Sequence, residues 1–378
     1  MKNTREWLKM VGEVRYFDDR TIVVRFRESM EVVSTLPVVS PSGLSSGPID
    51  TVVFREVSEE DVCCDLLGYY RKAVEEVGVE RALVVLTSAS LKQKFKHFHI
   101  EEGGTDIYMT VSLTPASCLE SRVYKPISIG TINIVVATNT SLTHNAMVDL
   151  LRAIVEAKTL ASVESLLYCG SRASGTISDS VSVLRPVSLE GVVLFAGIST
   201  DIGNAVARVV HEQIVSESVS RDLSRKLSDV VGVDIDTLGR LFSKIYEMYP
   251  IDNLSSSEVT SFALKRLKRT LSDPNVWSLL IAARELDLHG ISGSIPGLSR
   301  SEFLADSKRL VADEILGMSL AAYLAGVNGI MTMYWVERLK EEGLLEHQDL
   351  GIFEDDVVSA LLAFMIVDSI RELGYGET

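Results

Sequence analysis

Acidic residues gather beside apolar helical segments toward the carboxyl end of the chain. They form three pairs: Glu285 with Asp287, Asp313 with Glu314, and Asp355 with Asp356. Glu314 is expected to share a helix face with Leu310 and Met318, which is a core-type stripe. An acid on such a stripe is costly unless it is paired or binds a cation. Because carboxylates suit hard divalent cations, the pairs predict a metal site, with Mg²⁺ favoured and Mn²⁺ or Fe²⁺ as alternatives.

Each acid pair also has an ordinary explanation. Asp355 and Asp356 suit the start of a helix, where free N–H groups and the macrodipole favour negative charge. Ion pairs would account for the others, Glu285 with Arg284 or another surface base and Asp313 with Arg309. For one pair alone this explanation is preferred, whereas two acid pairs in apolar helices of one domain favour a metal site.

Two turns in the first half combine glycine, hydroxyl and aspartate. They are SGTISD at 174–179 and AGISTDIG at 196–203. Such turns present hydroxyls and backbone N–H groups that suit an anion, a carbonyl or an amide. Either turn alone is explained by strand-to-helix chemistry, with Asp201 capping the following helix. Lys158 is expected on the apolar side of its helix, where it reaches solvent or pairs with a carboxylate.

The first half carries the pattern of a layered α/β or α+β domain. Short β-branched runs predict strands, namely TIVVRF, TVVFREV, RALVVLTSA, TDIYMTVSL, GTINIVVATN, DSVSVL and GVVLFAG. Helical spacing is found between them at 59–78, 143–168 and 201–216. This mixture predicts one layered domain over residues 1–217.

Strand signals nearly vanish after residue 217. Six helical segments follow, which predicts an all-α, multihelical domain over residues 218–378. The stretch IVSESVSRD at the boundary contains no proline or glycine. We therefore expect a short joint between the domains and no flexible linker.

The composition excludes several classes of partner. With 46% hydrophobic and 24% charged residues, the chain can bury substantial cores. Its net charge of −15 argues against a nucleic-acid surface and an anionic membrane face. The longest apolar region, SLAAYLAGVNGIMTMYW, is shorter than the ~20 residues of a spanning helix and contains Asn328. No membrane span is expected, and a homo-oligomer is compatible with the composition.

The cysteines predict a reducing environment. Cys63 and Cys64 are neighbours, whereas Cys118 and Cys169 stand alone, and no C-x-x-C occurs. The amino-terminal stretch lacks the apolar run of a signal peptide. We therefore expect a cytoplasmic protein without a disulfide framework.

The acid-rich half resembles the phosphatidylglycerophosphatase A superfamily over roughly residues 225–372. The matching order is D-E-x-L-G-M, then G-x-x-x-D-D-x-x-x-A. The resemblance also includes ELD at 285–287, before the first motif, and MTMYWVERLK, which precedes the last helix. The resemblance is closer to the soluble branch, which includes an archaeal α-ribazole-5′-phosphate phosphatase. It implies metal-dependent phosphomonoester hydrolysis. Its implied ligands are Asp313, Glu314, Asp355 and Asp356, with Glu285 and Asp287 as further candidates.

Residues 10–215 resemble the adenosylcobinamide amidohydrolase family, most specifically in GTINI and E-A-K. That family hydrolyses the amide between the aminopropanol arm and the corrinoid, giving adenosylcobyric acid. This chain has Ile177 and Ser178 where the family usually has a glycine and a threonine. The QKFKHFH segment looks inserted. In it His97 and His99 are expected at an exposed, basic hairpin tip, which is favoured over a metal-ligand role.

Amide hydrolysis needs a nucleophile or activated water and a stabilised oxyanion. No recognisable triad supplies them, and no cofactor is evident for this half. Candidate acids and bases are Asp106, Glu156 and Asp179. Candidate hydroxyls are Thr105 and Thr176, and Asn133 and Lys158 are candidates for stabilising charge.

Together the two resemblances imply a bifunctional hydrolase of cobamide salvage, acting on adenosylcobinamide and α-ribazole-5′-phosphate. An alternative keeps the helical half as a phosphatase of another phosphomonoester beside a non-catalytic corrinoid-binding half. A third reading is a corrinoid carrier or sensor, in which the acids are structural.

Overall fold

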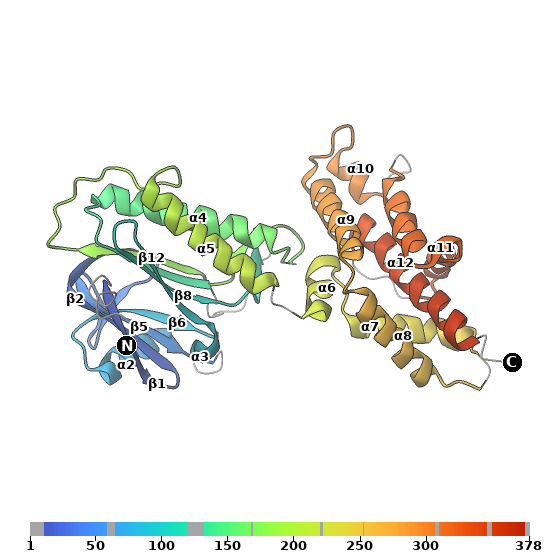
Figure 1. Ribbon diagram of the computed structural model, residues 1–378, viewed down its shortest axis with the longest axis horizontal. Helices are drawn as coiled ribbons and strands as arrows, with labels where there is room; N and C mark the ends of the chain where they lie inside the picture. The colour runs from blue at the N-terminus through green and yellow to red at the C-terminus, as the bar shows by residue number, and fades with distance from the viewer. Residues whose placement is uncertain are drawn as a thin grey trace. The chain divides into compact units, whose positions relative to one another are not determined.

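The computed structural model describes residues 11–58, 65–119, 132–167, 169–219, 222–251, 253–306, 310–345 and 350–374. The chain divides into two compact units, Met1–Ser220 and Arg221–Thr378. The first is an α/β unit and the second is helical, as predicted (Figure 1). The placement of the domain boundary between residues 217 and 218 stays a prediction.

Most strands of the first unit belong to one large sheet. Within the described residues it has ten strands in the order β4-β3-β6-β5-β2-β12-β10-β8-β7, with β1 paired to β2. Their bounds are β1 Gly12–Asp18, β2 Thr21–Ser34, β3 Val38–Ser40, β4 Gly43–Ser45, β5 Ile49–Glu56, β6 Ala82–Thr87, β7 Phe95–Ile100, β8 Thr105–Val111, β10 Ile132–Thr138 and β12 Ser180–Pro186. A separate pair consists of β9 (Ala116–Cys118) and β11 (Ala173–Thr176).

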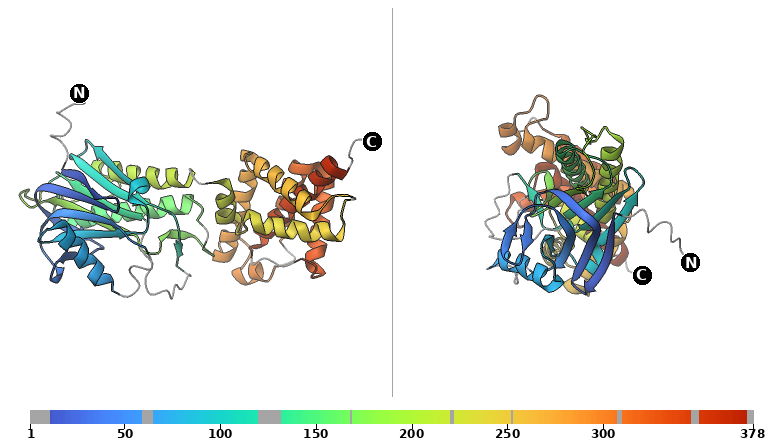
Figure 2. Two further views of the ribbon diagram at one scale, coloured as in Figure 1. Left: turned by 90° about the horizontal axis from the view of Figure 1, so that it is seen from below. Right: turned by 90° about the vertical axis from the view of Figure 1, so that its left-hand side faces the viewer.

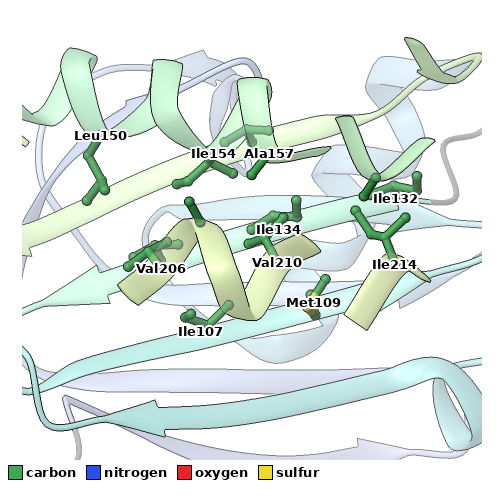
Figure 3. Packing of buried hydrophobic residues seen from close by; sticks show 14 of the residues in the cluster. Ile107, Met109, Ile132, Ile134, Leu150, Ile154, Ala157, Val206, Val210 and Ile214 are labelled. Atoms are coloured by element: carbon green, nitrogen blue, oxygen red, sulfur yellow. The ribbon is translucent and has the colours of Figure 1, made fainter. Parts of the chain in front are cut away.

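Helices α4 (His144–Glu164) and α5 (Asp201–Val219) cover one part of this sheet. Thr143 caps α4 by accepting the N–H of Ala146. Figure 3 shows side chains of both helices meeting those of β8 and β10. The labelled residues are Leu150, Ile154 and Ala157 of α4, Val206, Val210 and Ile214 of α5, and Ile107, Met109, Ile132 and Ile134 of the strands. This core fixes one face of the strands that carry the candidate catalytic residues.

Alternation along the strands separates the two faces of the sheet. Ile107 and Met109 of β8 face α4 and α5, whereas Tyr108 between them packs in a second core with Val135 and Leu184. Helix α2 (Leu66–Val77) packs on β3, β5 and β6 in a third core. Figures 1 and 2 show α2 well apart from the α4–α5 pair. A short helix, α3 (Leu91–Lys94), precedes β7.

One predicted strand is absent, and one segment expected at a hairpin tip forms a strand. The run GVVLFAG forms no strand and makes only an isolated bridge between Val193 and Leu142. Its Val192, Leu194 and Phe195 are exposed. Strand-type residues form a strand only where they can pack against a neighbouring strand, and these side chains do not. By contrast, KFKHFH contributes strand β7, which pairs with β8 along its whole length.

The second unit consists of helices. Their bounds are α6 Leu223–Val231, α7 Ile235–Met248, α8 Ser256–Thr270, α9 Pro274–Ser292, α10 Arg300–Leu304, α11 Ala312–Glu341 and α12 Ile352–Ser369, followed by a π-helical turn, Ile370–Gly374. Helix α12 is buried almost throughout and packs against α7, α8, α9 and α11. It is the central helix of the unit, which is why its sequence is apolar on all sides.

Helix α11 is interrupted at Gly326, whose φ of 67° lies in the left-handed region. A Cβ on Gly317 would lie 2.4 Å from Met333, and one on Gly329 would lie 2.2 Å from the carbonyl oxygen of Ala321. The two arms therefore pack closely against each other. By length and composition alone the helix could cross a membrane, and only 28% of its most apolar window is buried inside the protein. The absence of a membrane span stays a prediction.

Cys118 and Cys169 form a disulfide, so the expectation that they stand alone was wrong. Their Cα atoms are 5.9 Å apart although 51 residues separate them in sequence. Cys118 ends β9, which pairs with β11, and Cys169 lies shortly before β11. The fold brings them together through strand pairing that cysteine spacing does not reveal.

Candidate functional site

Three of the candidate catalytic residues are joined by hydrogen bonds, and a fourth is held nearby. Lys158 from α4 donates from Nζ to Oδ2 of Asp179 at 2.6 Å and to the carbonyl oxygen of Ser174 at 2.9 Å. Asp179 also accepts the backbone N–H of Thr176 at 2.9 Å and the Thr176 hydroxyl. Thr176 is 5% exposed, and the Lys158 and Asp179 side chains are each 9% exposed. A buried hydroxyl, carboxylate and ammonium group are thus linked in one row.

Gly175 makes this arrangement possible. Its φ is +154°, and an added Cβ would lie 2.0 Å from Oδ2 of Asp179 and 2.3 Å from Nζ of Lys158. Only glycine leaves space for the ion pair to rest against the turn. The glycine of the SGTISD turn therefore has a steric role that its sequence position alone does not reveal.

Asn133 is connected to this group through the strand that follows the turn. Ser180, the residue after Asp179, donates to Oδ1 of Asn133 at 2.7 Å. Nδ2 of Asn133 donates to Thr110 at 3.0 Å. The pairing of β10 with β8 and β12 places these three residues in one row across the sheet. Asn133 is therefore held in a fixed orientation within hydrogen-bonded neighbours.

Two other candidates lie outside this row. Glu156 is on the exposed side of α4 and pairs with Arg152 at 2.6 Å. Thr105 donates to the carbonyl oxygen of Glu102 and to the Thr138 hydroxyl. Helical spacing explains why Glu156 lies outside the row, because residues two positions apart on a helix, such as Glu156 and Lys158, point to different sides.

In the second glycine turn, the predicted cap is also shifted by one residue. The hydroxyl of Thr200 accepts the N–H of Gly203 at 3.1 Å, and Asp201 lies in the first turn of α5. Thr200 therefore caps the helix where Asp201 was expected to do so.

Asp106 belongs to a separate cluster on β8. It is fully buried and accepts the Val11 N–H at 2.6 Å, with His99 at 2.8 Å and His97 at 3.3 Å from its Oδ1. Burial raises the pKa of Asp106, but the hydrogen bonds from the two imidazoles and from Val11 outweigh it and lower the pKa overall. His97 is half-buried, where exposure was expected, and His99 is exposed; both lie within strand β7 and not in the turn that follows it. Their alternation along the strand was the signal that placed both beside Asp106.

The carboxylates of the second unit meet where α11 and α12 pack together. Asp313 and Asp356 are 4% and 7% exposed. Oδ1 of Asp313 is buried and has no hydrogen-bond partner. Glu314 is exposed, so the expectation that it occupies the buried stripe was wrong and Asp313 lies there instead. The interhelical packing of the folded hairpin decides which of the two adjacent acids is buried.

Burial and mutual repulsion raise the pKa of these acids. The pKa of Asp356 rises to about 8 through burial and the charges of Glu337, Asp313 and Asp355. The pKa of Asp313 rises to about 7 through burial and its neighbour Glu314. Lys340 lies 2.6 Å from Asp355 and 2.8 Å from Glu337. The cluster therefore contains more buried acid than this one lysine offsets.

In the third acid pair, Glu285 with Asp287, the aspartate caps a helix. Asp287 is fully buried and accepts the N–H groups of Phe353 and Glu354 at 3.0 and 2.8 Å, which caps α12 from the neighbouring helix α9. Burial and the nearby Glu354 raise its pKa to about 7. Arg284 pairs with Glu354 at 2.9 Å, whereas Glu285 is half-buried. Arg284 is therefore a buried residue and not the surface base that was suggested as a partner of Glu285.

The ordinary explanations for Asp313, Asp355 and Asp356 can be compared with the structure. Arg309, the suggested partner of Asp313, lies outside the described residues. Asp355 is in the first turn of α12, as a helix start requires, but Asp356 is buried against Gly317. Among the described residues, no three or more His, Cys, Asp or Glu side chains are already arranged around a metal position.

Similar proteins were found for parts of the chain. An uncharacterized protein of Methanocaldococcus jannaschii, MJ1613, is 22% identical over 234 residues, which are 54% of this chain and 88% of that protein. A second one from the same organism, MJ1330, is 29% identical over 119 residues, which are 31% of this chain and 90% of that protein.

Two solved structures also match. The low temperature requirement C protein from Listeria monocytogenes is 20% identical, covers 41% of this chain and 98% of its own, and has a TM-score of 0.33. The protein ypjQ from Bacillus subtilis is 22% identical, covers 39% of this chain and 93% of its own, and also has a TM-score of 0.33.

A family match covers the unit that carries the Lys158–Asp179 row. The family model for adenosylcobinamide amidohydrolase matches residues 7–226, more than half of the 378-residue chain. No corresponding support exists here for a phosphatidylglycerophosphatase A-like second half. The chain therefore belongs to the adenosylcobinamide amidohydrolase family.

Proposed function

We propose that the first unit hydrolyses the amide that joins the aminopropanol arm to the corrinoid of adenosylcobinamide. The observation that carries this proposal is the buried row of Thr176, Asp179 and Lys158 within the family-matched region. The products are adenosylcobyric acid and the free aminopropanol. Small-molecule hydrolysis of this kind is consistent with a compact polar site and needs no large partner surface.

The row supplies the groups that amide hydrolysis requires. The Thr176 hydroxyl already donates to Asp179, so the carboxylate can take its proton as the oxygen attacks the amide carbon. Lys158 orients Asp179 and stabilises developing negative charge. The proton then passes to the departing amine, and water cleaves the resulting ester with the same carboxylate as base. Asn133 lies next to this row and orients Ser180 behind Asp179.

Substitutions of Thr176 test the nucleophile. Thr176→Ala should abolish formation of adenosylcobyric acid, whereas Thr176→Ser should retain part of it because the hydroxyl remains. Glu156→Gln, on the same helix as Lys158 but exposed, is the matched control and should keep wild-type activity. Products are quantified by liquid chromatography and mass spectrometry. Equal activity of wild type and Thr176→Ala would exclude Thr176 as nucleophile.

We further propose that the second unit is a phosphomonoesterase, with α-ribazole-5′-phosphate as substrate. The supporting observation is the unpartnered, buried Oδ1 of Asp313 beside the buried Asp356. Asp313 and Asp356 would hold a divalent cation, with Glu314 and Asp355 as further ligands. Such a cation would neutralise phosphate oxygens and supply an activated water. The residues themselves contribute clustered carboxyl groups whose burial and mutual repulsion raise the pKa of Asp356 to about 8, so a bound cation would favour their charged form.

Phosphate release tests this second activity. Purified protein is incubated with α-ribazole-5′-phosphate in EDTA or with Mg²⁺ or Mn²⁺, as wild type and as Asp356→Asn. Cation-dependent release that the variant loses is the expected result. Glu341→Gln, an exposed acid on α11, is the control. Absence of release under every condition would leave the acids as structural groups and remove this activity from the proposal.

A further inference from the structure

The disulfide between Cys118 and Cys169 lies beside the turn that carries the proposed nucleophile. In the β9–β11 pair, Cys118 is opposite Ala173, Ser117 is opposite Gly175 and Ala116 is opposite Thr176. The disulfide therefore lies at one end of the short β9–β11 pair, and Thr176 lies at the other end. Ser174, also in β11, holds Lys158 through its carbonyl oxygen.

We propose that Cys118 and Cys169 form a reversible thiol–disulfide pair whose redox state positions the catalytic turn. The inference rests on the proposed amide hydrolysis and names a control of that site. β9 has only three residues, so few backbone hydrogen bonds hold it against β11. The covalent link is therefore a substantial part of what fixes the pair. In the reducing environment expected from the sequence, a disulfide of this kind would be transient and redox-sensing.

The surroundings accommodate both states of the pair. The carbonyl oxygen of Ser171 lies 3.1 Å from Sγ of Cys118 and 3.8 Å from Sγ of Cys169. After reduction this oxygen can accept an S–H group, so a freed thiol does not lose all polar contact. Cys118 is 5% exposed, whereas Cys169 is half-buried. The sulfur of Cys169 is the more accessible one for attack.

The reductant is a dithiol, and the exchange balances. One thiolate of the dithiol attacks Sγ of Cys169, the protein S–S bond breaks, and Cys118 leaves as a thiolate that takes a proton. The second thiol of the dithiol then displaces the Cys169 sulfur. The protein gains two thiols, and the dithiol becomes a cyclic disulfide. Oxidation by a disulfide reagent reverses the sequence.

Reduction should loosen the register of β9 on β11 and displace Thr176 from its productive position. A shift of about 1 Å at a reacting group can cost about 100-fold in rate, so a loss of about tenfold or more in kcat is expected. KM should change less, because the proposed displacement acts on the reacting hydroxyl of Thr176. The effect should disappear when the bond is restored.

The test uses the full chain in three states: oxidised with diamide, reduced with dithiothreitol, and reoxidised. Thiols are counted after denaturation, and kcat and KM for adenosylcobinamide are measured in each state. With four cysteines in the chain, two free thiols are expected when the bond is present and four after reduction. Cys118→Ser should have the low kcat in every state. Cys63→Ser/Cys64→Ser should respond as wild type does.

Reversible loss of kcat that follows the thiol count supports the proposal. Four thiols after diamide treatment, or the same kcat in oxidised and reduced protein, would overturn it while leaving amide hydrolysis intact. No hydrolysis in any state would overturn the amide-hydrolysis proposal and this one together. Because wild type is compared with itself, poor folding of Cys118→Ser does not affect the outcome.

Discussion

Nζ of Lys158 lies 2.6 Å from Oδ2 of Asp179, and both side chains are almost completely buried. A buried ion pair is a weak source of net stability, because desolvation offsets the attraction between the charges. Breaking such a pair is costly, however, since one charge remains buried without its partner. The pair is therefore better explained by a role in the site than by stability of the fold.

Replacing Lys158 with methionine should reduce both activity and stability. Lys158→Met leaves Asp179 without its cation, so the free energy of unfolding should fall by about 3–5 kcal/mol. The kcat for adenosylcobinamide should fall by about 100-fold or more, since stabilisation of developing charge is lost. Urea denaturation and steady-state kinetics measure the two effects.

Arg152→Met is the control for Lys158→Met, because Arg152 is an exposed cation on the same helix. It should change the free energy of unfolding by less than about 1 kcal/mol and leave kcat unchanged. Retention of full activity by folded Lys158→Met would contradict a role for Lys158 in the site.

Gly175→Ala tests the steric role of the turn. The new Cβ would collide with both members of the ion pair, and φ at this position is unfavourable for alanine. We expect a loss of about 2–4 kcal/mol in the free energy of unfolding and a large loss of kcat.

Gly170→Ala separates strain from collision. Gly170 also has a positive φ, of 86°, but an added Cβ there would meet nothing within 4 Å. It should cost only about 1 kcal/mol and spare activity. If both variants behaved alike, collision with Lys158 and Asp179 would not be the cause of the Gly175→Ala effect.

The raised pKa of Asp356 predicts how stability depends on pH in EDTA. The pKa of Asp356 is about 8 in the folded protein, against an ordinary value of 3.8. As pH rises, the unfolded chain therefore loses this proton at a lower pH than the folded protein does. Stability from the protonated acid is complete below about pH 4 and is lost as pH rises toward about 8. Asp356→Asn carries no such charge, so its Tm should exceed that of wild type by more at pH 8 than at pH 5.

The exposed acid Glu341 provides the comparison for this pH effect. Glu341→Gln should change Tm by a similar small amount at both pH values. A gap between Asp356→Asn and wild type that stays constant from pH 5 to pH 8 would refute the raised pKa.

The cap on α12 is a purely structural prediction. Asp287→Ala removes the acceptor of two buried N–H groups, so it should cost about 2–5 kcal/mol in the free energy of unfolding. Asp273→Ala, which removes an exposed cap of α9, should cost only about 1 kcal/mol. Denaturant titration of both variants gives the comparison. Equal costs would show that burial of Asp287 adds nothing to its role as a cap.

The proximity of several candidate site residues could be predicted from the sequence because their relationship is local. Thr176 and Asp179 belong to one turn, and helical spacing places Lys158 on the buried side of α4. Asn133 joins them only through the pairing of β10 with β12, which no local pattern specifies. The same limit applies to Asp106, whose partners His97 and His99 come from β7.

Features that depend on tertiary packing were the ones missed. GVVLFAG has strand composition, yet its apolar side chains are exposed and find no strand partner. Asp313 and Glu314 are adjacent, and only the folded hairpin of α11 decides that Asp313 is buried. The disulfide likewise depends on β9 meeting β11, far away in sequence.

The most direct test of the account is hydrolysis of adenosylcobinamide in H₂¹⁸O by wild type and Asp179→Asn. The account predicts that wild type releases aminopropanol and yields adenosylcobyric acid with ¹⁸O in the new carboxylate, while Asp179→Asn yields almost none. Absence of product with wild type, or equal product with folded Asp179→Asn, would contradict the assignment of amide hydrolysis to this row of residues.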